Sequence, residues 1–165
     1  MDASDSTNPS GYGFEVVDPR CPDAVASLES YFAELDERFE DDFDPGDTIS
    51  ADAANFEAPE GAFLVMRRQD SDGAFGCGAV QVLDDGAAEI KRMWIAPQAR
   101  GEGLGKAMLG ELETHARQLG NGVIRLDTNN VLSEAIAMYL SQGYVEIEAY
   151  NDNPYARHWF EKRAR

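Results

Sequence analysis

The sequence is poor in positive charge and in cysteine. It has 14 Lys and Arg, only three of them lysines, against 31 Asp and Glu, which gives 165 residues a net charge of −17. This balance argues against nucleic acid as a partner, because a polyanion would be repelled. The two cysteines, Cys21 and Cys77, are far apart and lack any ligand spacing. We therefore expect neither a disulfide framework nor a metal site.

Long apolar runs are also missing. No stretch is long enough to span a bilayer, and residues 1–12 are polar and acidic, unlike a signal peptide. We therefore expect a cytoplasmic protein without a membrane partner. Residues 1–12 are expected to form a flexible tail and residues 13–165 a single domain, because this length is typical of one domain. A homodimer is compatible with this composition.

What the sequence does have is clear periodicity. Apolar residues three and four apart predict helices at residues 22–39, 104–119 and 133–142, and a short helix is expected at 52–56. Between these, strands are predicted at residues 13–17, 62–68, 75–83, 87–95, 123–127, 144–148 and 158–162. Asp-Gly turns separate the strands from 62 to 95, which indicates an antiparallel meander. Alternating strands and helices then follow, so we expect an α/β domain with a mixed sheet.

A glycine-rich loop, residues 100–106, joins a strand to a helix. Gly101 and Gly105 are separated by three residues and Ala107 follows Lys106, which excludes a P-loop and its magnesium-binding hydroxyl. The third glycine of a dinucleotide fingerprint is also absent. The backbone N–H groups of such a loop nevertheless converge at the positive end of the helix, which predicts a pyrophosphate cradle.

The same loop resembles a motif of the GNAT superfamily of N-acetyltransferases, whose pattern is Gln/Arg-x-x-Gly-x-Gly/Ala. Arg100, Gly103 and Gly105 match it without a gap, and residues 135–139 followed by Gly143-Tyr144 resemble the family's next motif. Together the two motifs cover roughly residues 87–145. The resemblance implies a GNAT-like fold of the α+β type: a mixed, mostly antiparallel sheet of six to seven strands, flanked by about four helices.

The resemblance also implies a site for acetyl-CoA, with no metal. The backbone amides of the strand before the loop would hold the pantetheine arm and the thioester carbonyl. Many relatives place an Asn where this chain has Leu132, and Asn129 and Asn130, just upstream, are the candidates to replace it. The implied cofactor-binding residues are Met93, Trp94, Ile95, Arg100, Gly101, Glu102, Gly103, Leu104, Gly105, Lys106 and Asn130.

Two residues are candidates for proton transfer. Tyr139 would protonate the departing thiolate, because a phenol stays protonated at neutral pH; its position on an apolar stripe also suits core packing. Glu89 would act as the base, directly or through a water, and in a buried strand its pKa could rise. Lys91 or Arg92 could instead pair with Glu89 and make it structural.

The acceptor is the least determined part. Acidic residues between Glu34 and Asp44 lie where this family binds its acceptor, and they would suit a cationic amine; a solvated helix face is the other interpretation. The sequence thus predicts an N-acetyltransferase that transfers acetyl from acetyl-CoA to a primary amine of a small molecule or peptide. The alternative is a non-catalytic acyl-CoA-binding sensor or interaction module.

Overall fold

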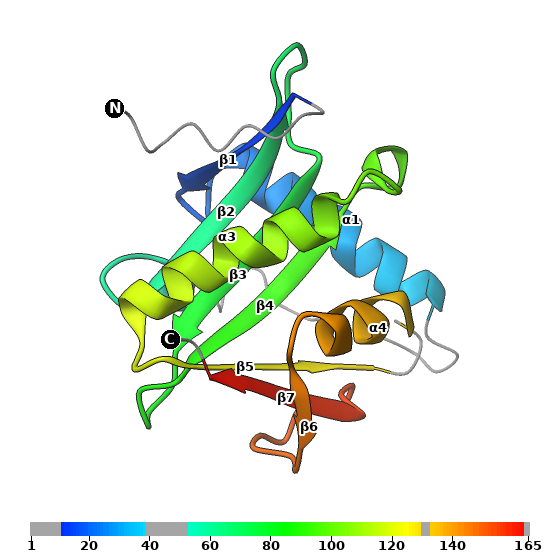
Figure 1. Ribbon diagram of the computed structural model, residues 1–165. Helices are drawn as coiled ribbons and strands as arrows, with labels where there is room; N and C mark the ends of the chain where they lie inside the picture. The colour runs from blue at the N-terminus through cyan, green and yellow to red at the C-terminus, as the bar shows by residue number, and fades with distance from the viewer. Residues whose placement is uncertain (1–10, 39–52, 130–132, 164–165) are drawn as a thin grey trace.

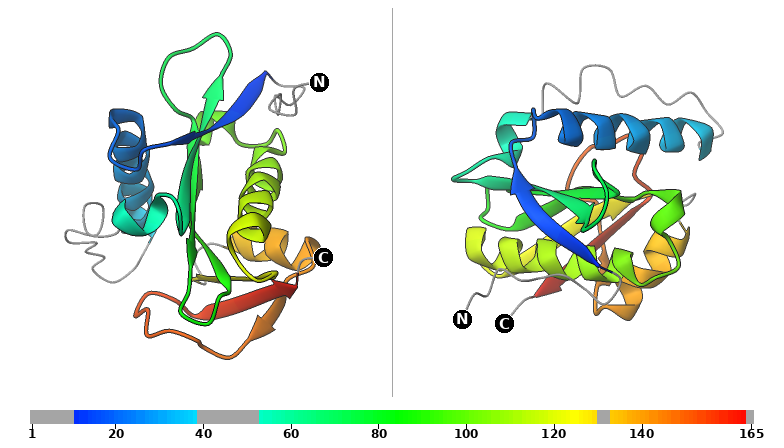
Figure 2. Two further views of the ribbon diagram at one scale, coloured as in Figure 1. Left: turned by 90° about the vertical axis from the view of Figure 1, so that its left-hand side faces the viewer. Right: turned by 90° about the horizontal axis from the view of Figure 1, so that it is seen from above.

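A seven-stranded mixed sheet organises the protein. The computed structural model describes residues 11–38, 53–129 and 133–163. The strands lie in the order β1-β2-β3-β4-β5-β7-β6, and only the β4–β5 pair is parallel. Helix α1 covers one face of the sheet, and α3 and α4 cover the other (Figures 1 and 2). The expected mostly antiparallel sheet is confirmed.

The elements follow the predicted order closely, and most of their ends fall within a residue of the predicted ones. They are β1 (Tyr12–Val17), α1 (Pro22–Arg38), η1 (Ala53–Phe56), β2 (Gly61–Arg68), β3 (Gly76–Val82), β4 (Ala88–Ile95), η2 (Pro97–Ala99), α3 (Leu104–Leu119), β5 (Val123–Thr128), α4 (Ser133–Ser141), β6 (Val145–Ile147) and β7 (His158–Arg163). Three α-helices and two 3-10 turns lie in the described part of the chain, against about four helices expected. Tyr12, which the sequence placed in the tail, begins β1 and is buried against Phe75.

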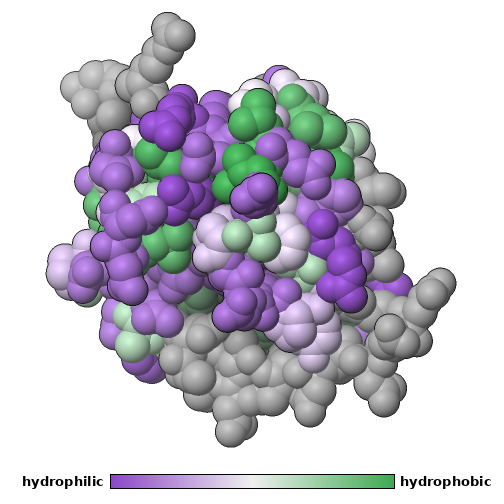
Figure 3. Space-filling model, turned by 90° about the horizontal axis from the view of Figure 1, so that it is seen from below, coloured by the Kyte–Doolittle hydropathy of each residue, from purple (hydrophilic) through white to green (hydrophobic). Residues whose placement is uncertain are grey.

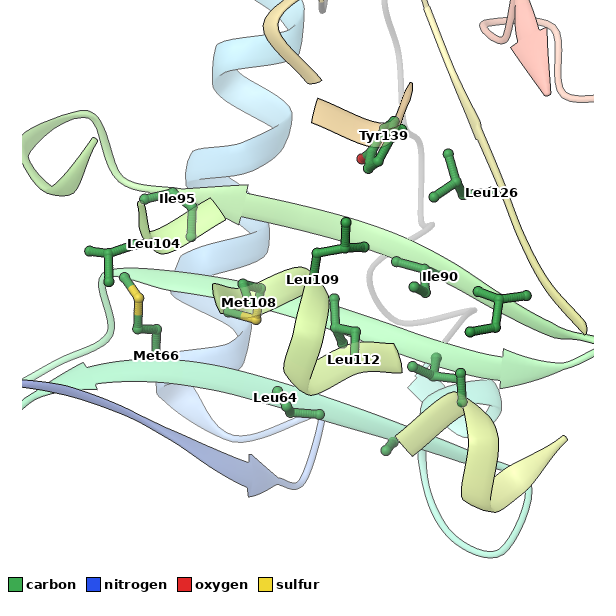
Figure 4. Packing of buried hydrophobic residues seen from close by; sticks show 14 of the residues in the cluster. Leu64, Met66, Ile90, Ile95, Leu104, Met108, Leu109, Leu112, Leu126 and Tyr139 are labelled. Atoms are coloured by element: carbon green, nitrogen blue, oxygen red, sulfur yellow. The ribbon is translucent and has the colours of Figure 1, made fainter. Parts of the chain in front are cut away.

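Alternating side chains of the central strands build a core on each face of the sheet. In β2, Leu64 and Met66 point toward α3, whereas Phe63 and Val65 point toward α1, as a period of two requires. The α3 face is filled by apolar side chains of the sheet and of α3, among them Leu112 (Figure 4). These two cores hold both helix layers rigidly against β4, the strand that carries the site.

The surface carries the negative composition. Seen from below, it is largely hydrophilic, interrupted by a few hydrophobic patches (Figure 3). Within the described residues, no helix is both long and apolar enough to cross a membrane.

Strands β4 and β5 separate soon after they begin. Their parallel pairing is confined to Ala88 with Ile124 and Glu89 with Arg125, and the strands then diverge (Figure 1). On its other side β4 contains a bulge, because Cys77 pairs with Trp94 while Ala79 pairs with Lys91, leaving one extra residue on β4. The gap between the diverging strands is where the site lies.

Gly61 provides a test of the packing around β2. A Cβ there would lie 2.0 Å from the carbonyl oxygen of Asn55, which is backbone and has no rotamer to move. We expect Gly61→Ala to lower the free energy of unfolding by about 1–3 kcal/mol, measured by chemical denaturation.

The matched control is Gly110→Ala, on the exposed side of α3, where a Cβ meets no atom within 4 Å. This substitution should raise stability by about 0.5–1 kcal/mol, because alanine loses less backbone entropy in a helix. Equal effects of the two substitutions would contradict the packing described here.

Candidate active site

The main cavity occupies the gap between β4 and β5 and has a volume of about 400 Å³. Elements from both faces of the sheet contribute to its wall. It is lined by Ile90 to Ile95 of β4, by Arg100, Gly101, Gly103, Leu104 and Gly105 of the loop and α3, by Leu126 to Thr128 of β5, by Glu134, Ala135, Met138 and Tyr139 of α4, and by Tyr31, Glu34 and Leu35 of α1. A ligand in this cavity can therefore contact groups on both faces at once.

The glycine-rich loop has the geometry of an anion cradle. Gly101 and Gly103 have φ of 86° and 77°, a left-handed conformation that disfavours other residues. Helix α3 begins after Gly103 without any side-chain cap, so the N–H groups of Leu104 and Gly105 lack an intrahelical acceptor. A Cβ at Gly101 or Gly103 would meet nothing within 4 Å, so the space in front of the loop is open. These groups fit a pyrophosphate.

Arg100 has a structural task that the sequence did not reveal. Its Nε donates to the carbonyl oxygen of Ile95 at 2.8 Å, and its Nη2 donates to Glu34 Oε1 at 2.5 Å. The indole N–H of Trp94 donates to the same carboxylate oxygen at 3.1 Å. Glu34 thus ties α1 to both the end of β4 and the start of the loop. The sequence offered Glu34 only as one acid among many, because its partners lie 60 and 66 residues away.

Glu34 has a lowered pKa. Burial raises the pKa of this carboxyl, but the hydrogen bonds from Arg100 and Trp94 and the nearby guanidinium charges outweigh burial. Glu34 is therefore ionised at neutral pH, and its charge stabilises the folded state.

Tyr139 lies in the wall of the main cavity, near Leu126 (Figure 4). The residue is 7% exposed, and its ring packs against Tyr144 and Phe160 at centroid distances of 5.9 and 6.1 Å. Burial raises the pKa of the Tyr139 phenol well above its usual value, so the phenol is protonated at neutral pH. Among the described residues, none is hydrogen-bonded to this hydroxyl. The expected core packing of the ring is confirmed, and the residue also lines the cavity; its role in proton transfer stays a prediction.

Glu89 lies outside the main cavity. It is 2% exposed and lines an adjoining hollow of about 980 Å³. Its carboxylate accepts hydrogen bonds from Gln81 at 2.7 Å, Tyr150 at 2.6 Å and Asn151 at 3.4 Å, and Lys91 Nζ lies 3.7 Å away. The ion pair with Lys91 that the sequence left open is therefore present, and Lys91 borders both spaces.

Asp127 is a carboxylate that the sequence analysis missed. It lines the main cavity, and its two oxygens accept from Asn151 at 2.7 Å and Asn153 at 3.2 Å. Asn151 is itself fixed by the indole N–H of Trp159 at 2.9 Å and also reaches Glu89. Within the described residues, Asp127 forms no ion pair. Along β5, Asp127 alternates with the buried residues Ile124 and Leu126. This pattern in the sequence indicates that Asp127 lies on the face of the strand opposite to theirs.

The structure brings most of the predicted cofactor-binding residues together. Met93, Trp94, Ile95, Arg100, Gly101, Gly103, Leu104 and Gly105 all line the main cavity. Glu102 and Lys106 are in the same loop and helix start but do not line it, and Asn130 lies outside the described residues. In the described ranges, no cluster of three potential metal ligands is found.

Comparison with known proteins agrees with this geometry. The chain matches the acetyltransferase (GNAT) family over residues 28–144. It belongs to that family. A protein named IAA acetyltransferase, from Azospirillum brasilense, is 34% identical over 125 residues, which are 75% of this chain and 78% of the relative. The chain is accordingly an acyltransferase.

Solved GNAT structures share the fold. A Klebsiella pneumoniae protein described as an acyl-CoA N-acyltransferase superposes with a TM-score of 0.76 at 27% identity, over 94% of this chain and 99% of its own. A GNAT acetyltransferase from Elizabethkingia anophelis, solved with acetyl-CoA bound, gives a TM-score of 0.67 at 13% identity, over 93% and 98% of the two chains.

Glu34→Gln tests the link between α1 and the loop. Because the folded-state pKa of Glu34 is lowered, its contribution to stability is present above the unfolded-state pKa and is lost as the pH falls through the folded-state pKa. We expect the variant to be about 1 kcal/mol less stable than the parent at pH 7, with a difference that shrinks in acid. Denaturation at several pH values measures this.

Glu37→Gln, on the exposed side of the same helix, is the matched control and should change stability by less than about 0.5 kcal/mol. A Glu34→Gln difference that stays constant into acid would show that the carboxylate charge is not what holds α1 to the loop.

Proposed function

We propose that this GNAT protein is an acetyl-CoA-dependent N-acetyltransferase in which a primary amine of a small molecule or peptide attacks the thioester directly. The observation that carries the proposal is one cavity that joins an open anion cradle at Gly101–Gly105 to a protonated, buried phenol at Tyr139. The acetyl-CoA bound to the Elizabethkingia anophelis protein of the same fold supports the choice of donor.

The donor would enter between the separated strands. The N–H groups at the start of α3 would bind the pyrophosphate, and the backbone of Met93, Trp94 and Ile95 would hold the pantetheine arm and the carbonyl. The donor supplies an activated acetyl thioester. The chain's part would be to hold the thioester with its carbonyl between β4 and β5, within reach of an amine in the same cavity.

Proton transfer requires an acid and a base. Tyr139 would protonate the thiolate, because its phenol is protonated and the residue lines the cavity. We propose Glu89 as the base that takes the ammonium proton, with Asn151 and Asp127 between it and the cavity. The route would need a water, because Glu89 does not line the cavity itself.

Tyr139→Phe tests the acid. Turnover, measured as thiol release with a panel of amines, should fall by about 10²–10⁴-fold, because the ring remains and only the proton donor is removed. The affinity for CoA, measured by calorimetry, should stay within about twofold of the parent.

The matched control is Tyr144→Phe, which removes a hydroxyl from the same aromatic group but one that donates to Glu113 at 2.9 Å, outside the cavity. Its turnover should be close to that of the parent. Equal losses in both variants would mean that removing any hydroxyl from this aromatic group disturbs the site, and would contradict a specific role of Tyr139 as proton donor.

Glu89→Gln and Asp127→Asn distinguish the base from a binding group. If Glu89 takes the proton, Glu89→Gln should lower kcat by about 10²-fold or more, since an amide cannot accept it. Asp127→Asn should mainly raise KM for the amine, because it removes a charge that faces the cavity. The opposite pattern would transfer the role of base to Asp127.

A further inference from the structure

The acceptor side of the main cavity contains an unusual backbone feature. Arg92 lies in the β4 bulge with φ of 59°, and it is the only described residue other than glycine with a positive φ. Such a conformation costs a non-glycine residue of order 1 kcal/mol and persists only where the surroundings impose it. Strained residues of this kind gather at functional sites.

The bulge changes the direction of the Arg92 side chain. In a regular strand, Arg92 would alternate with Lys91 and face α3. Instead, its guanidinium carbon lies 5.4 Å from the ring centre of Phe32 and 5.9 Å from that of Phe56, both on the α1 side. Lys91 pairs with Glu89, and it also borders the cavity. Lys91 and Arg92 are thus two consecutive cationic residues that both line the main cavity.

A negative pole lies on the other strand. Asp127 lines the cavity from β5 and is held by the neutral amides of Asn151 and Asn153. Neutral donors fix the carboxylate without cancelling its charge, so it is suited to pair with a cation from the ligand.

Tyr31 of α1 lies within electrostatic reach of both poles. Burial raises the pKa of Tyr31 to about 12, Arg92 lowers it, and Asp127 raises it. Its phenol is therefore protonated at neutral pH and can donate to an acceptor group between the two strands.

We propose that the acceptor is an amino carboxylate, whose ammonium group pairs with Asp127 while its carboxylate pairs with Arg92, supported by Lys91. Arginine suits this task, because its planar guanidinium binds a carboxylate through two parallel hydrogen bonds. The inference rests on the proposed acetyl transfer and specifies its substrate class. A simple monoamine would satisfy only one of the two poles.

The reaction agrees with this arrangement. The ammonium group first loses one proton to the base. The nitrogen then forms a bond to the acetyl carbon as the carbon–sulfur bond breaks, the thiolate takes the proton of Tyr139, and the second proton that the nitrogen must lose returns to the Tyr139 phenolate. The product is a neutral amide that still carries its carboxylate. Its attraction to Asp127 is lost, and only the contact with Arg92 remains, which favours release.

Matched substrates test the proposal. The parent protein would be assayed with acetyl-CoA and the common α-amino acids, and then with the carboxamide and the decarboxylated amine of the best substrate. We expect kcat/KM to be at least about tenfold higher for the amino acid than for either analogue, since a charge-assisted contact is lost. Arg92→Gln should bring this ratio close to one, and Arg92→Lys should retain part of it.

The control is Arg68→Gln, an exposed arginine of β2, which should keep the full ratio. CoA binding by calorimetry shows that each variant is folded. A parent protein that acetylates amines as well as or better than amino acids would overturn the amino-carboxylate assignment and leave the acetyltransferase proposal intact.

Absence of turnover with every substrate would contradict the proposed function instead. Calorimetry of amino-acid binding in the presence of CoA would then test the amino-carboxylate assignment without relying on turnover. Binding of amino acids that Arg92→Gln weakens at least about tenfold would support it, and no binding, or binding unchanged in Arg92→Gln, would overturn it.

Discussion

The separation of β4 from β5 is the constraint on which the site depends. Two pairs of residues hold the strands parallel, and beyond Glu89 the pairing ends. Without a bulge, β4 would continue its regular twist beside β3. The extra residue at the bulge changes both the course of β4 and the directions of its side chains. Groups from α1, α4 and the glycine-rich loop can then line one cavity. The divergence of the two strands of the sheet thus provides the opening.

The opening requires support, because diverging strands lose their hydrogen bonds to one another. Two polar networks replace them. Near the loop, Glu34 joins α1 to Trp94 and Arg100. Near the base of the gap, Asn151 joins Glu89 of β4 to Asp127 of β5. No fully buried side-chain nitrogen or oxygen in the described residues lacks a hydrogen-bond partner, and the polar side chains of both networks are paired, so the networks can support the two separated strands.

Local patterns were sufficient to predict the helices and strands. The helix at residues 104–119 was predicted with its observed ends, because its apolar stripe is regular and Gly103 and Gly120 flank it. The bulge was not predictable, since Arg92 carries none of the glycine signals of a left-handed residue. Long-range pairs such as Arg100 with Glu34 were also missed, because local periodicity contains no information on partners 66 residues apart. Asp127 could have been found from strand alternation alone.

The net charge of −17 and the anionic donor are compatible, because they act over different distances. At physiological salt, charges separated by more than about 8–10 Å are largely screened, so the acidic surface weakens the approach of a pyrophosphate only modestly. At contact, the N–H groups at Gly103–Gly105 act within hydrogen-bond range and are not screened in this way. The same argument applies to the proposed acceptor: Arg92 and Asp127 line the cavity, so their local charges would act on a bound ligand more strongly than the total charge does.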